Sequence, residues 1–195
     1  WIIGREKRIE TVGKACDAKD VQRPEDVVSD ARLSYDAVGN VVRSESLSGY
    51  ADGRPQYTTD GSLTFDAYGR PKTTTDVFGK VTKIDYAPAA GQIVTRVVTT
   101  NPLGHTDTTE TDLGRGSILA KEDANGRRSV MRYDALGRLV TAWSPDRDPD
   151  TKSPDAEFTY DVRPDAPVVI TTKSLVDDGS YRSSYEIYDS SLRIR

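Results

Sequence analysis

The densest group of side chains that could do chemistry lies in a polar loop near residues 144–157. Counting Asp146 as position 1, carboxylates fall at positions 1, 3, 5 and 12, as Asp146, Asp148, Asp150 and Glu157. This is the ligand spacing of an EF-hand loop, and calcium prefers such clustered oxygen ligands. However, Thr151 stands where that loop needs glycine, Pro149 and Pro154 interrupt it, and no flanking helix is expected. The spacing therefore offers a calcium site as one hypothesis and a solvated acidic loop as the other.

Other groups that enzymes use are present but are not arranged for catalysis. Glycosidases need two carboxylates at a defined separation, and candidates are Asp36, Asp66, Asp76, Asp123, Asp134 and Asp161. Each recurs at the same place in a short repeated unit, so a role in turns explains them better. The lone histidine, His105, follows a repeat glycine, and the single cysteine, Cys16, has no histidine near it in sequence. No GxSxG, HExxH, Walker A or GxGxxG motif occurs. The sequence predicts neither an enzyme nor a cofactor.

The repeated unit reads aromatic, Asp, small, apolar, Gly, then a basic or polar residue. Residues 35–40, 65–70 and 133–138 are the strong copies, residues 76–80, 101–105 and 123–127 are weaker, and residues 111–115 are a slipped copy. Tyr160-Asp161 and Tyr188-Asp189 keep the dipeptide without the glycine. The residues expected to build these turns are Tyr35, Asp36, Gly39, Phe65, Asp66, Gly69, Asp76, Gly79, Asp123, Gly126, Tyr133, Asp134, Gly137 and Arg138.

The chemistry of the unit explains its residue types. Glycine takes positive φ without a Cβ clash and closes a tight turn, while a short aspartate side chain accepts hydrogen bonds from turn amides. The aromatic residue ends a strand, where it can stack on a neighbouring repeat. The aromatic series comprises Tyr35, Phe65, Tyr86, Tyr133, Tyr160 and Tyr188. It is interpreted as an inter-strand ladder, with a sugar-binding face as the alternative.

The spacing of the turns predicts the fold class. Turn signals about every 8–12 residues are typical of all-β chains, so we expect consecutive β-hairpins that form a curved or spiralling sheet strip. Residues 80–86 alternate as a strand, with Thr82, Ile84 and Tyr86 on one face, and residues 92–100 and 168–172 are β-branched runs. We expect the strip to cover residues 35–195, after an irregular N-terminal segment over residues 1–34 in which Pro24 to Arg32 could form a short helix.

The amino-acid composition limits the kinds of partner that the chain is expected to bind. Hydrophobic residues make up 35% of the 195 residues and charged residues 30%, with a formal net charge of −4. The sequence has no basic cluster of the kind that would predict binding to nucleic acid. No apolar run approaches the roughly 20 residues of a membrane-spanning helix. The chain opens on Trp1 and stops inside an apparent strand, so we interpret it as a fragment. Exposed strand edges invite pairing, and we expect the isolated chain to self-associate.

The repeat resembles that of the Rhs/YD-repeat family. The sharpest copy, from Arg132 to Val140, is close to the family consensus, and the resemblance covers roughly residues 33–195. It implies a β-hairpin strip from a hollow shell of a secreted or surface bacterial protein, which encloses and delivers a C-terminal toxin. The partners so implied are neighbouring repeats and the toxin cargo. The alternative is a wall-associated, adhesive member that contacts cell-surface glycan. The family's autoproteolytic DPxG-type motif is not carried over, since Asp148-Pro149-Asp150-Thr151 lacks its glycine.

Overall fold

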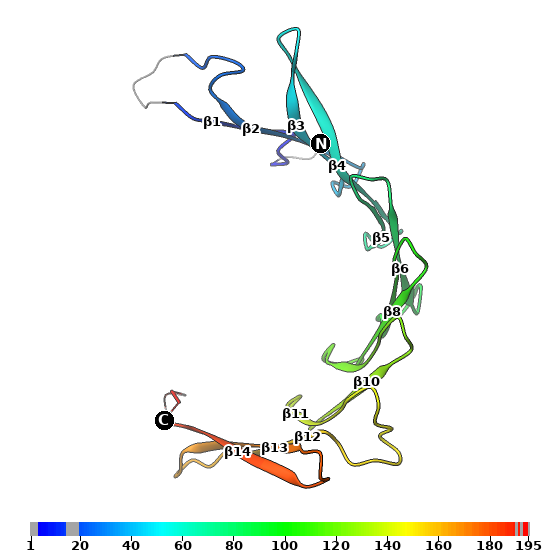
Figure 1. Ribbon diagram of the computed structural model, residues 1–195, viewed down its shortest axis with the longest axis vertical. Helices are drawn as coiled ribbons and strands as arrows, with labels where there is room; N and C mark the ends of the chain where they lie inside the picture. Colours follow the sequence, from blue (N-terminus) through cyan, green and yellow to red (C-terminus); the bar gives the residue numbers. More distant parts are fainter. Residues whose placement is uncertain (1–3, 15–19, 190, 192, 195) are drawn as a thin grey trace. The chain divides into compact units, whose positions relative to one another are not determined.

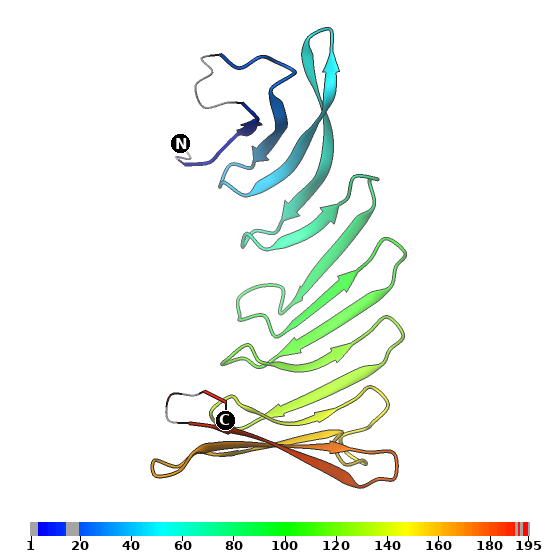
Figure 2. The same ribbon diagram turned by 60° about the vertical axis from the view of Figure 1, so that its left-hand side comes forward.

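The computed structural model describes residues 4–14, 20–189, 191 and 193–194, and all its regular elements are β-strands (Figures 1 and 2). The strands are β1 Arg8–Val12, β2 Val27–Tyr35, β3 Val41–Ala51, β4 Arg54–Phe65, β5 Pro71–Thr75, β6 Val81–Ala87, β7 Arg96–Thr100, β8 Thr106–Thr111, β9 Ile118–Glu122, β10 Arg128–Tyr133, β11 Leu139–Trp143, β12 Ala156–Asp161, β13 Val168–Leu175 and β14 Tyr181–Tyr188. The 14 strands follow one another in the sheet in chain order. The predicted all-β class and the consecutive hairpins are confirmed.

The chain divides into two compact units, Trp1–Ile84 with Thr100–Gly104, and Asp85–Thr99 with His105–Arg195. In the first unit, antiparallel ladders join β1 to β2, β2 to β3, β3 to β4, and β4 to β5. In the second unit, ladders run without a break from β8 to β14. Each hairpin thus hydrogen-bonds to the next hairpin within its unit.

The N-terminal segment differs from expectation, because it contains two paired strands. The helix predicted over Pro24 to Arg32 is wrong: Val27 opens β2, which pairs with β1 with Arg8 opposite Arg32. The turn before β2 is tight, since the Asp26 amide donates to the Gln22 carbonyl at 2.8 Å. Helix formation there would leave the main-chain groups of β1 unpaired, whereas the ladder satisfies both strands.

The predicted strands elsewhere match the structure with one shift in boundary. In β6, Thr82, Ile84 and Tyr86 are less exposed than their neighbours, as the alternation predicted. The run over residues 168–172 lies within β13. The run over residues 92–100 forms a strand only from Arg96, so the predicted start was four residues early.

The strands carry very little apolar core. Among the described residues, Ala120 and Trp143 are the only hydrophobic side chains that are fully buried, at 2% and 5% exposure. Many large apolar side chains stay exposed, including Val38 at 79% and Leu136 at 74%. The sheet in each unit therefore depends on ladder hydrogen bonds and polar contacts more than a compact globule does.

Candidate functional site

Five of the repeat turns that contain a glycine share one hydrogen-bond pattern. In the turn after β10, Asp134 Oδ1 accepts the main-chain N–H groups of Leu136 and Arg138, both at 2.9 Å. The Gly137 amide donates to the Asp134 carbonyl at 2.9 Å, and Gly137 has a φ of 80°. The same carboxylate bonds, to the amides two and four residues later at 2.9–3.0 Å, recur at Asp36, Asp66, Asp76 and Asp123. These aspartates are therefore turn acceptors in the structure.

The two dipeptides without glycine behave differently from each other. Asp189 Oδ1 accepts the amides of Ser191 and Arg193 at 2.9 and 3.1 Å, so it keeps the repeat pattern. Asp161 instead ends β12 and forms an ion pair with Arg163 at 2.9 Å. Among the described residues, no turn amide donates to Asp161, so the interpretation of Asp161 as a turn aspartate fails.

The arginine after the glycine links one repeat to the next. Arg138 Nε donates to Asp134 Oδ2 at 2.7 Å, and its guanidinium carbon lies 4.5 Å from the centre of the Tyr160 ring. The hydrogen bond from the Arg138 amide, followed by the bond from its side chain, lowers the pKa of the Asp134 carboxyl below its ordinary value. Because it contacts its own turn and a tyrosine of β12, Arg138 couples two hairpins.

The repeat tyrosines also anchor neighbouring strands through their hydroxyl groups. Tyr133 Oη donates to the Ile118 carbonyl and Tyr160 Oη to the Leu139 carbonyl, both at 2.9 Å. Those carbonyls belong to the first residues of β9 and β11. Tyr35 Oη makes a corresponding bond of 2.8 Å to the Glu6 carbonyl. This role was not predicted from the sequence. The signal that could have indicated it is the tyrosine at most copies of the repeated aromatic position, because tyrosine carries a hydroxyl donor that phenylalanine lacks.

Two of these tyrosines, Tyr35 and Tyr160, have an arginine against the ring. Arg138 lies over Tyr160, and Arg5 lies 6.0 Å from the centre of the Tyr35 ring. A guanidinium placed over an aromatic face gains electrostatic attraction from the ring. Tyr35, Tyr133 and Tyr160 thus have structural contacts through their hydroxyl groups, and Tyr35 and Tyr160 also through their rings. The inter-strand ladder of stacked aromatic rings stays a prediction.

A second cluster that the sequence did not reveal lies in the first unit. The Asp30 side chain is 0% exposed and accepts Arg8 Nε at 2.9 Å and Arg8 Nη2 at 2.6 Å. Tyr57 Oη also donates to Asp30, and the Arg32 guanidinium carbon lies 3.6 Å from the centre of the Tyr57 ring. Arg8 further contacts Glu10 at 2.9 Å. The charges compensate one another, so the cluster secures β1, β2 and β4.

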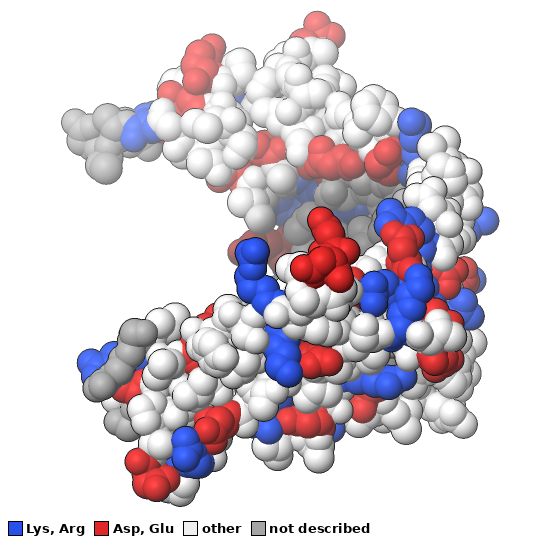
Figure 3. Space-filling view, turned by 60° about the horizontal axis from the view of Figure 1, so that its bottom comes forward, with Lys and Arg blue, Asp and Glu red and all other residues white. Residues whose placement is uncertain are grey.

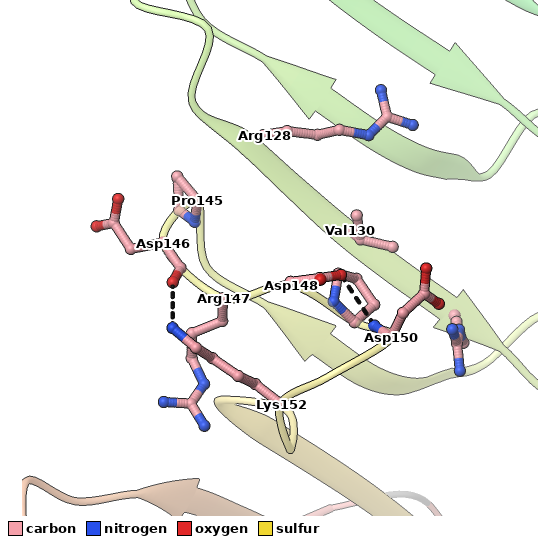
Figure 4. A pocket seen from close by; sticks show the side chains of 10 residues that line it. Arg128, Val130, Pro145, Asp146, Arg147, Asp148, Asp150 and Lys152 are labelled. Carbon is pink, nitrogen blue, oxygen red and sulfur yellow. Dashed lines mark hydrogen bonds between the residues drawn. The ribbon is translucent and has the colours of Figure 1, made fainter.

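The carboxylates of the acidic loop are not gathered into one site. Asp146 pairs with Arg127 at 2.9 Å, and Glu157 lies 3.7 Å from Lys173. Asp148 accepts the Asp150 amide at 3.0 Å (Figure 4). It also accepts the Thr151 hydroxyl at 3.1 Å. Over the described ranges, no group of three or more His, Cys, Asp or Glu side chains is placed to hold a metal. Calcium binding stays a prediction, and no preformed set of ligands in the described residues supports it.

The two remaining sequence candidates are His105 and Cys16. His105 lies between the repeat glycine Gly104 and the start of β8. Cys16 lies outside the described residues. In Figure 3, acidic and basic side chains are interspersed over the face in view. No helix in the described part of the chain is long and apolar enough to cross a membrane.

Comparison with known proteins gives a structural likeness alone. No family model and no curated protein matches the sequence. A structure of the Photorhabdus luminescens Tc holotoxin pore, with a mutated TccC3, matches with a TM-score of 0.57 and 19% identity over 85% of this chain and 9% of that chain. A crystal structure of TcdB2-TccC3 matches with a TM-score of 0.57 and 18% identity over 96% of this chain and 10% of that one.

The likeness concerns the fold. This chain spans about a tenth of the length of the toxin-complex chains that it matches. The likeness confirms the fold of consecutive β-hairpins that the resemblance implied.

Proposed function

We propose that the chain is a wall segment of a secreted or surface Rhs/YD-repeat protein that encloses and delivers a C-terminal toxin. The observation that carries the proposal is a sheet of consecutive hairpins with almost no apolar core of its own. Only Ala120 and Trp143 are fully buried apolar side chains in the described part of the chain. An enzyme needs a packed scaffold to hold reacting groups in place. A wall needs instead a sheet whose strands continue side by side over many hairpins.

The repeat chemistry supports this role. The turn aspartates satisfy main-chain amides at the ends of the strands, and Arg138 and Tyr160 connect successive hairpins. Such units bury their surfaces only against neighbours, so stability accumulates along the strip. Because Oδ1 of each turn aspartate accepts main-chain amides, these carboxylates are poor candidates for acid–base catalysis, and we propose a non-enzymatic role.

The likeness to chains of toxin complexes supports secretion and toxin delivery. The partners proposed are the neighbouring repeats of the same polypeptide and its toxic cargo. A glycan-binding, adhesive role was the alternative, but the hydroxyl groups of Tyr35, Tyr133 and Tyr160 are bound to main-chain carbonyls. No observation in the described residues favours that alternative.

The proposal is tested by protease protection in the intact polypeptide that carries this segment. We expect the C-terminal region to resist added protease until the wall is weakened by the paired substitution Asp66→Ala and Asp134→Ala, each of which removes a turn acceptor. The matched control is Asp60→Ala together with Asp107→Ala, which changes aspartates outside the repeat motif. A C-terminal region that is cut rapidly in the folded wild-type protein would contradict enclosure.

A further inference from the structure

The long β3–β4 hairpin, drawn in cyan in Figure 2, ends in a two-residue loop. Asp52 and Gly53 form the whole loop, since the residues on either side of them pair with each other. The ladder from β2 to β3 reaches no further than Ser46, and the ladder from β5 to β4 begins only at Ser62. The end of the hairpin is therefore two-stranded in the described structure, and a two-stranded hairpin is only marginally stable by itself.

The loop has the backbone of the tight turn that Asp-Gly favours in hairpins. The φ angle is 49° at Asp52 and 71° at Gly53, and positive φ at both central residues is typical of a type I′ turn. In the described part of the chain, Asp52 is the one residue other than glycine with a positive φ. An L-residue takes this conformation at a cost, because its Cβ approaches the following carbonyl oxygen.

The groups of this dipeptide that can react with each other are free. Asp52 and Gly53 are both exposed. Over the described residues, no donor contacts the Asp52 carboxylate, and the Gly53 N–H donates to no acceptor. Glycine also has no Cβ to hinder an approach to its nitrogen. Ring closure between the Asp52 carboxyl carbon and the Gly53 nitrogen therefore needs only rotations within the loop.

We propose that Asp52-Gly53 is a site of spontaneous isoaspartate formation. The Gly53 nitrogen attacks Cγ of the protonated Asp52 carboxyl, a C–N bond forms, and the hydroxyl group leaves with the amide proton as water. The product is a cyclic imide. Water then opens the ring. Opening at Cγ restores aspartate, and opening at the main-chain carbonyl leaves the chain running through the side chain. One water is released and one is consumed, so the change needs no oxidant or reductant.

The Asp60-Gly61 dipeptide has the same chemistry but is held by the sheet. Asp60 Oδ2 accepts the Ser46 hydroxyl at 2.6 Å. Gly61 lies within β4, opposite Ser44 of β3. Ring closure there requires the carboxyl to leave its donor and the strand to leave its ladder. We therefore expect Asp60 to isomerise more slowly than Asp52.

The Asp178-Gly179 dipeptide has both of its reacting groups engaged. Asp178 Oδ1 accepts the Ser180 amide at 2.8 Å, and the Gly179 amide donates to the Val176 carbonyl at 2.9 Å. Hydrogen bonds from the Ser180 side chain and amide lower the pKa of the Asp178 carboxyl, so less of it is in the neutral form that reacts. These two dipeptides are internal controls of identical composition for Asp52-Gly53.

The modification would change the hairpin that carries it. An isoaspartate in place of Asp52 adds one carbon atom to the main chain of the loop. A two-residue loop joins its strands because its backbone twist matches theirs, and the longer linkage removes that match. The ladder should then open from the pair Ala51 and Arg54, which closes the loop. This inference is independent of whether the wall encloses a toxin.

The test measures isomerisation at the three Asp-Gly dipeptides of one chain. The chain is incubated at low concentration in heavy-oxygen water at about pH 5, where a fraction of aspartate carboxyls is neutral. Each opening of the imide leaves one heavy oxygen atom in the residue, which mass spectrometry detects, and chromatography separates isoaspartyl from aspartyl peptides. Chymotrypsin cuts after Tyr57 and so separates Asp52 from Asp60. A parallel sample in urea gives the rate at each dipeptide in the unfolded chain.

We expect the ratio of folded to unfolded rates to be at least about fivefold higher for Asp52 than for Asp60 or Asp178. This is the factor that one ordinary hydrogen bond contributes. Three equal ratios would overturn the proposal, as would a higher ratio at Asp60 or Asp178. So would a folded chain in which no isoaspartyl peptide from Asp52 accumulates while the urea sample forms it.

The matched variant is Asp52→Gly, which removes the carboxyl and keeps a residue that accepts positive φ. After the same incubation, the wild-type chain should lose hydrogen-exchange protection at the loop end of β3 and β4, whereas the variant should keep it. Equal losses in the two chains would refute the effect of the modification on the hairpin.

Discussion

Replacing Arg8 by methionine should open the first unit of the sheet from its β1 side. Arg8 supplies three of the hydrogen bonds that compensate the Asp30 carboxylate, at 2.9, 3.0 and 2.6 Å. The Asp30 side chain is 0% exposed, so water does not replace a lost partner without local rearrangement. After the substitution, Tyr57 is the one donor to the Asp30 carboxylate that remains in the described part of the chain. Glu10 keeps Arg23, which donates to it at 2.9 Å, so the damage is confined to Asp30.

The magnitude follows from the burial of the two partners. Removing one member of a buried ion pair costs about 3–5 kcal/mol, because the other charge is left uncompensated. The Arg8 side chain is itself 43% exposed, and solvent screening weakens its half of the pair. We therefore expect a loss of about 3 kcal/mol in the free energy that opens β1 and β2, which is a factor of about 100 in hydrogen-exchange protection.

Hydrogen exchange followed by mass spectrometry at pH 7 measures this loss on peptides from β1 and β2. The matched control is Arg43→Met, which removes a surface pair: Arg43 lies 2.8 Å from Glu45, with side chains 50% and 24% exposed. Exposed pairs of this kind contribute about 0–1 kcal/mol. If the two variants lose equal protection, the reasoning from burial of Asp30 is refuted.

The pH dependence checks the same reasoning by another route. The hydrogen bonds from Arg8 are the main cause that lowers the pKa of Asp30 below its ordinary 3.8. A carboxyl whose folded pKa is lowered adds stability above its unfolded pKa and loses that stability as the pH falls through its folded pKa. The difference in urea midpoint between wild type and Arg8→Met should therefore be full at pH 7 and shrink below about pH 4. A difference that grows on acidification would contradict the assignment.

Four further outcomes are expected. Asp134→Asn should lower exchange protection of its hairpin more than Asp123→Asn does, because only Asp134 also accepts the Arg138 side chain; equal losses would argue against the coupling role. Gly137→Ala should cost about 1 kcal/mol or more in unfolding free energy, since φ is +80° and the added Cβ would lie 2.8 Å from Arg115 Cδ, and an unchanged urea midpoint would disprove it. The isolated chain should self-associate at high concentration, as measured by light scattering, and a monodisperse monomer would contradict this expectation. Calcium at millimolar concentration should give a calorimetric signal only if the acidic loop rearranges, and a blank titration ends that hypothesis.

The fold was predictable because its turns are local. An aspartate that reaches amides two and four residues later, followed by a glycine with positive φ, is complete within one short segment. The sequence therefore shows the turns directly, and the strands must occupy the intervals. The β2 strand escaped prediction because no such turn precedes it. Its charged residues Asp30 and Arg32 are placed by partners in β1 and β4, which are distant in sequence.

The site was less predictable for the same reason. The spacing of Asp146, Asp148 and Asp150 suggested a common ligand, but spacing alone does not fix the direction of loop side chains. The carboxylate of Asp146 pairs with Arg127, and that of Asp148 accepts the Asp150 amide and the Thr151 hydroxyl. The Arg132–Trp143 stack depends on cross-strand pairing of β10 with β11, where Val130 lies opposite Trp143. That register becomes visible only once the hairpin is built.

The apolar residues at the turn tips argue that the sheet meets further protein. Val38 and Leu136 stand two residues after the turn aspartate and are 79% and 74% exposed. Asn125 holds the same place in the turn after β9 and donates the same amide hydrogen bond, to Asp123 at 2.9 Å. The turn therefore tolerates a polar side chain there, and its own geometry does not require an apolar one. Burial against a neighbouring surface is the physical gain that an exposed valine or leucine still offers, and it adds to the exposed strand edges as a reason to expect self-association of the isolated chain.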